Sequence, residues 1–187
     1  MRKHTILSCD KMNIFKKRPK EVMLSAAQKK QRAVAPSTSL EALEKLLKDS
    51  DPDVIAVVAG RPGISPETLE ELSKHPNPDV LAAVAGNPNT PPGTLEELAK
   101  KNKDHPRVLI SVAFNPNTPP GTLEELSKHP NPVVRASVAE SLNTPEETLG
   151  TLAGDKDKDV SQTAINTMMV VRFWRNVRAA HTNIDKN

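Results

Sequence analysis

The chain has 187 residues, enough for one domain with tails, and its single cysteine excludes an internal disulfide and a cysteine-ligated zinc or iron–sulfur cluster. Three Phe, one Trp and no Tyr exclude a core built on aromatic side chains, so the core has to consist of Leu, Val, Ile and Ala. The net charge of +3 divides into an acidic middle between basic ends: residues 1–34 carry ten Lys/Arg and two Asp/Glu, residues 35–166 carry twelve and twenty, and residues 167–187 carry four and one.

Residues 1–34 are predicted to form a basic arm that ends in a capping helix over residues 21–34. Residues 5–7 are too short an apolar stretch for a secretory signal, and Met12 offers an alternative start. The candidate interaction residues of the arm are Lys16, Lys17, Arg18, Lys20, Lys29, Lys30 and Arg32. Two interpretations stay open: the arm binds nucleic-acid phosphates or an acidic protein surface, or it is a solvated tail that folds back on the acidic middle.

Residues 35–166 repeat with a period of about 26 residues, and the segment NPNTPPGTLEEL occurs twice, at 87–98 and 115–126. We divide the region into five units, 35–60, 61–86, 87–114, 115–140 and 141–166. Two leucines and one valine recur in phase in each unit: Leu43, Leu46 and Val54; Leu69, Leu72 and Val80; Leu95, Leu98 and Val108; Leu123, Leu126 and Val134; Leu149, Leu152 and Val160. This pattern predicts a solenoid, because so small a unit buries its apolar face only against its neighbours.

Each unit is predicted to hold a first helix, a turn, a second and shorter helix, and another turn. The first helix begins at a hydroxyl residue ahead of a proline, which caps it; the predicted caps are Ser65, Thr90, Thr118 and Thr144. Glu147 completes a capping box with Thr144. The second helix is capped by Asp51, Asn77 or Asn131, and Gly60 or Gly86 ends it as the C′ residue.

The unit pattern N-P-N-T-P-x-x-x-L-x-x-L-(A/S)-K-x-P-x-P-x-V-(R)-x-x-V-A resembles the leucine-rich repeat variant, an all-helical bacterial repeat similar in style to HEAT and armadillo arrays. The resemblance covers residues 35–166 and is strongest in the third and fourth units. It implies an α-superhelix with a concave surface and no single activity. We therefore predict an all-α, right-handed α-solenoid of five repeats of about 26 residues with helical caps.

Residues 164–181 are predicted to form a longer closing helix, and residues 167–187 a C-terminal cap and tail. Arg172, Arg175 and Arg178 recur at a spacing of three, so they share one slowly drifting helix face with Trp174 close by. Trp and Arg are the residue types that anchor interfaces, which makes these four residues interaction candidates. The alternative, which we favour for Trp174, is that its ring fills the end of the core.

Residues that could support catalysis or metal binding recur in phase instead of converging. His75 and His129 occupy the same slot of different units, where a metal site is less expected than a cation at a helix C-terminus. Paired glutamates recur as ladders: Glu70 and Glu71, Glu96 and Glu97, Glu124 and Glu125. These ladders form an acidic stripe for a basic partner or a solvated face with i, i+4 Lys partners, and the second interpretation is favoured. We predict no catalytic residues, no metal and no cofactor.

The predicted function is a non-enzymatic, cytoplasmic protein-binding scaffold in a bacterium, without membrane association. The partner is expected to contact variable positions of the second helices, if that slot faces outward: Ile55, Leu81, Leu109 and Arg135. The alternative is a nucleic-acid-binding helical-repeat protein that uses the basic arm and the basic C-terminal helix. The net charge of −8 over residues 35–166 argues against this alternative, because it repels phosphate.

Overall fold

The computed structural model describes residues 24–184, and within this range the chain forms eleven α-helices and no strand. The helices are α1 (Ala26–Val34), α2 (Leu40–Leu46), α3 (Pro52–Ala59), α4 (Pro66–Leu72), α5 (Pro78–Gly86), α6 (Pro92–Lys101), α7 (Pro106–Phe114), α8 (Pro120–Leu126), α9 (Pro132–Glu140), α10 (Glu146–Leu152) and α11 (Lys158–Ile184). The prediction of an all-α fold is confirmed.

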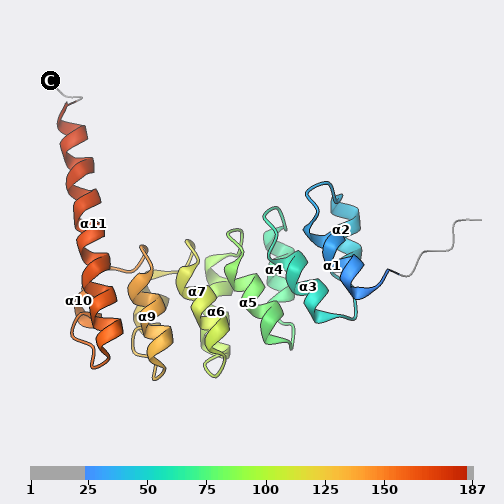
Figure 1. Cartoon of the computed structure of the whole chain (residues 1–187), viewed down its shortest axis with the longest axis horizontal. Helices are drawn as coiled ribbons and strands as arrows, with labels where there is room; N and C mark the ends of the chain where they lie inside the picture. Colours follow the sequence, from blue (N-terminus) through green and yellow to red (C-terminus); the bar gives the residue numbers. More distant parts are fainter. Residues whose placement is uncertain (1–23, 185–187) are drawn as a thin grey trace, which may run out of the picture.

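The helices form two rows that run along one array. Odd-numbered helices pack on each other in series, α1 on α3, α3 on α5, and so on to α11, whereas the even-numbered helices pack mainly on their odd-numbered neighbours. Figure 1 shows the helices following one another in chain order, from α1 at one end to α11 at the other. Each helix contacts only helices close to it in the sequence, so the array is an α-solenoid. The unit boundaries, the number of units and the right hand stay predictions.

The core follows the predicted positions. The in-phase leucines Leu69, Leu95, Leu123 and Leu149 of the even row and the valines Val54, Val80, Val108 and Val134 of the odd row are completely buried. Burial stabilises the fold by about 1.5–3 kcal/mol for each such side chain. Buried alanines, including Ala59, Ala85, Ala113 and Ala139, accompany them on the odd helices. Small side chains let adjacent odd helices approach closely, which explains why a core without aromatic residues closes.

The second helices are capped as predicted. Asp51 accepts a hydrogen bond from the backbone N–H of Asp53, Asn77 from that of Asp79, and Asn131 from that of Val133. In each case the following proline occupies the first helical position, where its missing N–H costs nothing. Ser65 caps α4 by accepting from the N–H of Thr68, as the sequence also predicts.

The prediction that threonines cap the first helices is wrong. Helices α6, α8 and α10 begin after Pro91, Pro119 and Pro145 with no side-chain cap. The hydroxyls of the preceding threonines instead donate backwards to the carbonyls of residues six positions earlier, which end the previous odd helix: Thr90 to Val84, Thr118 to Val112 and Thr144 to Val138. Each of these carbonyls also accepts one backbone N–H at the helix end, from Asn87, Asn115 or Ser141. The buried hydroxyl therefore bonds to the second lone pair of the carbonyl oxygen.

The glycines do not end the second helices as C′ residues. Gly60 has a right-handed φ of −74°, and Gly86 is the last residue of α5. Among the described residues only Gly63 has a positive φ, 99°. Helix α5 ends because Asn87 precedes a proline and takes an extended conformation, with ψ 127°.

The asparagine side chains of the NPNT turns tie successive repeats together. The amide of Asn87 donates to the carbonyl oxygens of Ala59 and Arg61, at 2.6 and 2.7 Å, and the amide of Asn115 donates to Ala85 and Asn87, at 2.6 and 2.8 Å. Both asparagines are buried. The guanidinium of Arg61 replaces the amide one repeat earlier and donates to Ala33 and Ala35. This ladder was not predicted from the sequence.

The C-terminal region is one helix, whereas the sequence analysis expected a short second helix followed by a separate cap. Helix α11 runs from Lys158 to Ile184 because residues 158–184 contain no proline or glycine to interrupt it. Its first part packs on α9 and α10, and its second part projects past the array (Figure 1). No helix in the described range is both long enough and apolar enough to cross a bilayer.

Candidate interaction surface

The outer surface of the even row is a ladder of paired charges. Lys100 pairs with Glu96, Lys101 with Glu97 at 2.7 Å, and Lys128 with Glu124 at 2.8 Å, all at i, i+4. The hydrogen bond to Glu96 raises the pKa of Lys100, and the charge of Glu125 on the next helix adds to this. The hydrogen bond from Lys128 lowers the pKa of Glu124. Three of the six glutamates of the acidic ladder, Glu96, Glu97 and Glu124, are therefore neutralised by lysines of the same repeat.

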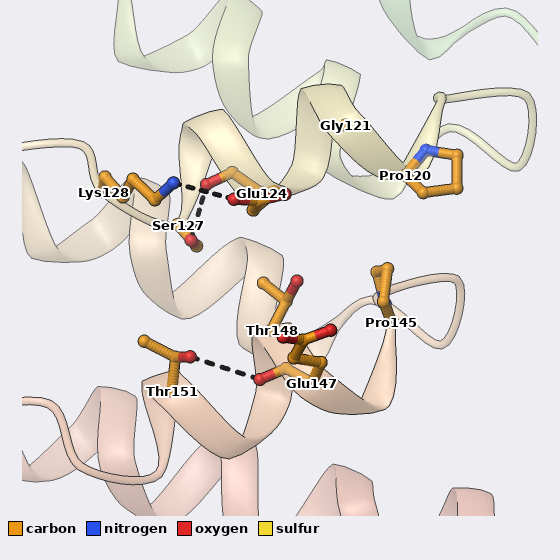
Figure 2. Close-up of a pocket in the computed structure, with 9 residues that line it drawn as sticks. All are labelled: Pro120, Gly121, Glu124, Ser127, Lys128, Pro145, Glu147, Thr148 and Thr151. Atoms are coloured by element: carbon orange, nitrogen blue, oxygen red, sulfur yellow. Dashed lines mark hydrogen bonds and ion pairs between the residues drawn. The ribbon is translucent and has the colours of Figure 1, made fainter.

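A groove of about 280 Å³ opens between α8 and α10 (Figure 2). Its lining residues come from two successive even helices and the prolines before them: Pro120, Gly121, Glu124, Ser127, Lys128, Pro145, Glu147, Thr148 and Thr151. The hydroxyl of Ser127 donates to the carbonyl of Glu124, and that of Thr151 to the carbonyl of Glu147. The groove offers hydroxyl, carboxylate and ammonium groups from α8, α10 and the turn that follows α8, which suits hydrogen bonding to a polar chain.

The C-terminal candidates lie on the projecting part of α11. Trp174 does not fill the end of the core: its residue is 63% exposed and its ring meets Phe173 edge to face, with centroids 5.8 Å apart. The expectation fails because α11 continues past the helices on which its first part packs. Arg172 and Arg175 both bind Glu146 of α10, at 2.7 and 2.8 Å, and their hydrogen bonds lower the pKa of that carboxylate. The side chain of Arg178 is outside the described part.

The N-terminal candidates divide into two sets. Lys16, Lys17, Arg18 and Lys20 lie outside the described residues. Lys29 binds Asp49 at 2.7 Å and Lys30 binds Asp53 at 2.6 Å, so both connect α1 to the start of the repeat array. The side chain of Arg32 is exposed at the last turn of α1.

The slot that was expected to face a partner faces inward. Ile55, Leu81 and Leu109 are buried, and Arg135 is only 6% exposed. Arg135 donates twice to Asp155, at 2.7 and 2.8 Å, and also to the carbonyls of His129 and Pro130. The hydrogen bond lowers the pKa of Asp155 and raises that of Arg135. Arg135 is thus a structural residue, because each of its three guanidinium nitrogens donates to a group within the chain.

The repeated histidines are hydrogen-bond acceptors in turns. The Nδ1 atoms of His75 and His129 accept the N–H of Asn77 and Asn131, the residues that cap the next helix, both at 3.1 Å. Nε2 of His129 lies 3.0 Å from the carbonyl of Lys103, which fixes the neutral tautomer with a proton on Nε2. Asp49 and Asp155 make the same turn bond in other repeats. The expected role of a cation at a helix end is therefore wrong.

Reactive side chains do not converge in the described part: no group of three or more His, Cys, Asp or Glu there has the geometry to hold a metal ion. The lining of the α8–α10 groove consists of glutamate, lysine, serine and threonine side chains, and its two hydroxyl groups with described bonds donate to helix carbonyls. These groups can recognise another molecule by hydrogen bonds and charge.

Comparison with protein families supports the assignment made from the repeat pattern. Residues 79–142, 64 of the 187, match the Leucine Rich Repeat Variant domain. This span runs from α5 to the end of α9, and it includes both NPNT turns and the asparagine ladder between them. No curated protein matches the chain.

Proposed function

Because residues 79–142 form a leucine-rich repeat variant domain, we propose that this chain is a non-enzymatic binding module that holds another protein on its solenoid surface. The same proposal places it in the cytoplasm, which cell fractionation would check. Such a module needs a rigid scaffold that presents regularly spaced groups, and the two rows of helices provide one.

The groove between α8 and α10 is the observation that carries the proposal. The odd helices bury the core in a continuous series, whereas successive even helices make few contacts with each other. Polar groups from two repeats therefore line an open channel (Figure 2). Glu124, Glu147, Thr148 and Thr151 lie on helices, which position them more firmly than loops do. A polar, extended segment of a partner fits this lining best.

Two glycines allow a matched test of the groove. A Cβ atom added at Gly121 or at Gly150 meets no atom within 4 Å, so both positions have space for a side chain to begin. Gly121 lines the groove, whereas Gly150 of α10 does not. The tagged chain is purified from its native lysate and its bound proteins are identified by mass spectrometry. We expect Gly121→Gln to lose a stoichiometric protein partner that Gly150→Gln retains.

Retention of the partner by both variants would contradict the assignment to this groove, and the absence of any stoichiometric partner would contradict the proposed function. Both variants replace a helical glycine by a better helix former, so a loss of stability does not explain an effect at one site only. Far-UV circular dichroism confirms that each variant is folded.

Nucleic acid is the second candidate partner, and the basic arm is the observation that favours it. Within the described range, however, Lys29, Lys30, Arg172 and Arg175 are already paired with carboxylates. Neutralised cations contribute less to phosphate binding, which is why the protein partner is preferred. Nuclease treatment of the same lysate separates the two: material that absorbs at 260 nm and is released by nuclease and by salt would favour nucleic acid.

A further inference from the structure

The projecting part of α11 exposes a stripe of large apolar side chains. Met169, Val170, Phe173 and Trp174 are 65, 43, 61 and 63% exposed. We call these four residues the α11 stripe. Their spacing of i, i+1, i+4 and i+5 places them on one side of the helix, as in a helix that packs against another helix. An exposed stripe of this kind on a soluble surface marks an interaction site.

The stripe is turned away from the rest of the molecule. Val160, Ala164 and Thr167 are the buried residues of α11 and mark the side that packs on the array. At 100° per residue, the centre of the stripe lies about 120° around the helix from that side. Since this half of α11 also projects beyond the other helices (Figure 1), a second body can approach it without colliding with the solenoid.

The α11 stripe has no charged side chain, so an uncharged partner surface fits it best. None of its four residues carries a charge, and the nearby Arg172 and Arg175 point around the helix toward Glu146, which binds both. A strongly acidic or basic partner therefore finds no complementary group on the stripe. Two copies of the chain, by contrast, can bring their stripes together while their arginines stay on the far sides.

The stripe is also complementary to itself in size. In an antiparallel pair with its two-fold axis between Val171 and Arg172, Met169 faces Trp174 of the second copy, and Val170 faces Phe173. A large ring is thus opposite a smaller side chain at each position, and a methionine sulfur against an aromatic ring is a favourable contact. Phe173 and Trp174 are 61 and 63% exposed, so the four aromatic residues of a dimer can supply roughly 400–600 Å² of buried surface at about 150–250 Å² for each fully buried residue. Met169 and Val170 of both copies add to this area, toward the roughly 1,000 Å² at which specific interfaces begin.

We propose that two copies of this chain associate through antiparallel pairing of their α11 stripes. This dimer is independent of the partner proposed for the α8–α10 groove, because the two surfaces share no residue. It doubles the number of grooves in one particle and places the two solenoids on opposite sides of the paired helices.

Sedimentation equilibrium of the full chain tests the proposal. We expect a monomer–dimer equilibrium in the wild type, and dissociation constants at least about tenfold weaker in Met169→Lys and in Trp174→Glu. The double variant, Met169→Lys with Trp174→Glu, is expected to regain dimerisation at low ionic strength, because each lysine then faces a glutamate of the other copy. High salt should weaken this recovered dimer. Residues 169 and 174 are five apart, so the new charges do not pair within one helix.

Leu142→Glu is the matched control, since Leu142 is 68% exposed but lies outside α11; it should leave the dimer unchanged. A wild-type chain that is monomeric up to about 100 μM, or a dimer that survives Trp174→Glu, overturns the proposal. Flotation of a monomeric chain with anionic phospholipid vesicles, lost in Trp174→Glu, would assign the stripe to a lipid surface instead. Circular dichroism and thermal unfolding show whether each variant keeps its fold.

Discussion

At the scale of single residues, either an aspartate or a histidine can occupy one position of the repeat and make the same hydrogen bond in the turn. Asp49, His75, His129 and Asp155 all accept the N–H of the residue two positions on, and so hold the turn before the next odd helix. The two aspartates add ion pairs, Asp49 with Lys29 and Asp155 with Arg135, and in the second pair both side chains are largely buried. Residues at the same position of different repeats can therefore be compared with each other. The comparison separates the contribution of an ion pair from that of the shared turn hydrogen bond.

The pair of Arg135 and Asp155 predicts a specific pH dependence. The hydrogen bond from Arg135 lowers the pKa of Asp155 below its unfolded value of about 3.9. The carboxylate therefore stabilises the fold above about pH 4, and this stabilisation is lost as the pH falls through the folded pKa. Asp155→Asn keeps a turn acceptor but removes the charge, and it should cost about 3–5 kcal/mol of unfolding free energy at pH 7.

Chemical denaturation of wild type and Asp155→Asn between pH 7 and pH 2 checks this prediction. The difference between their unfolding free energies should shrink in acid, because protonated Asp155 no longer pairs with Arg135. Other carboxylates with a lowered pKa, such as Asp49 and Glu146, titrate in both proteins and cancel in the difference. A difference that is constant with pH would mean that the ion pair does not stabilise the fold.

At the scale of elements, the turns are as important as the helices. The first Asn of each NPNT turn bridges two carbonyls that flank an earlier turn, Ala59 and Arg61 in the case of Asn87, and the Thr bonds back to the helix that has just ended. Helices of seven to ten residues are too short to be stable alone, so these bonds help to fix one short helix against the next.

Asn115→Ala tests the asparagine ladder. The substitution removes the amide donor of the buried carbonyls of Ala85 and Asn87. The carbonyl of Asn87 still accepts the N–H of Thr90, so the cost should be about 1–3 kcal/mol, the amount for one buried unpaired group. Asn117→Ala is the control, because Asn117 is exposed and water can replace its bonds to Pro88 and Thr90. Urea unfolding followed by circular dichroism measures both. Equal losses in the two variants would show that the buried ladder has no special role.

At the scale of the whole molecule, the stability of the fold should depend on the contacts between each odd-numbered helix and the next one in the series. Helices α5 and α7 pack directly on each other, whereas α3 and α9 do not touch. The effects of two substitutions on the unfolding free energy should therefore be coupled when the substitutions lie in adjacent repeats, and additive when they lie in distant repeats.

Double-mutant cycles measure this coupling. Val84→Ala and Val112→Ala remove buried methyl groups from α5 and α7, and Val58→Ala and Val138→Ala do the same in α3 and α9. We expect an interaction energy of about 0.5 kcal/mol or more for the adjacent pair and additivity within about 0.5 kcal/mol for the distant pair. Comparable coupling in both cycles would instead indicate a single core that unfolds as one unit.

The candidate surfaces were only partly predictable from the sequence. Arg135 reads as a variable surface residue, because only the structure brings Asp155, 20 positions later, against it. Trp174 reads as a core residue, because its burial depends on where α11 leaves the array. The α8–α10 groove has no sequence signal of its own, since it arises from the distance between helices that do not pack on each other.

The sequence by itself determined the helical class, the in-phase core leucines and valines, and the Asp and Asn caps of the second helices, because these depend on periodicity and on groups a few residues apart. Tertiary structure decided the partners of Thr90, Asn87 and Arg135 and the exposure of the α11 stripe. A buried polar group takes its best partner from whatever the packed repeats bring within reach, and that partner lies 28 residues away for Asn87. The local sequence pattern does not show which residues of other repeats lie within hydrogen-bond distance, because the stacking of the repeats brings them together.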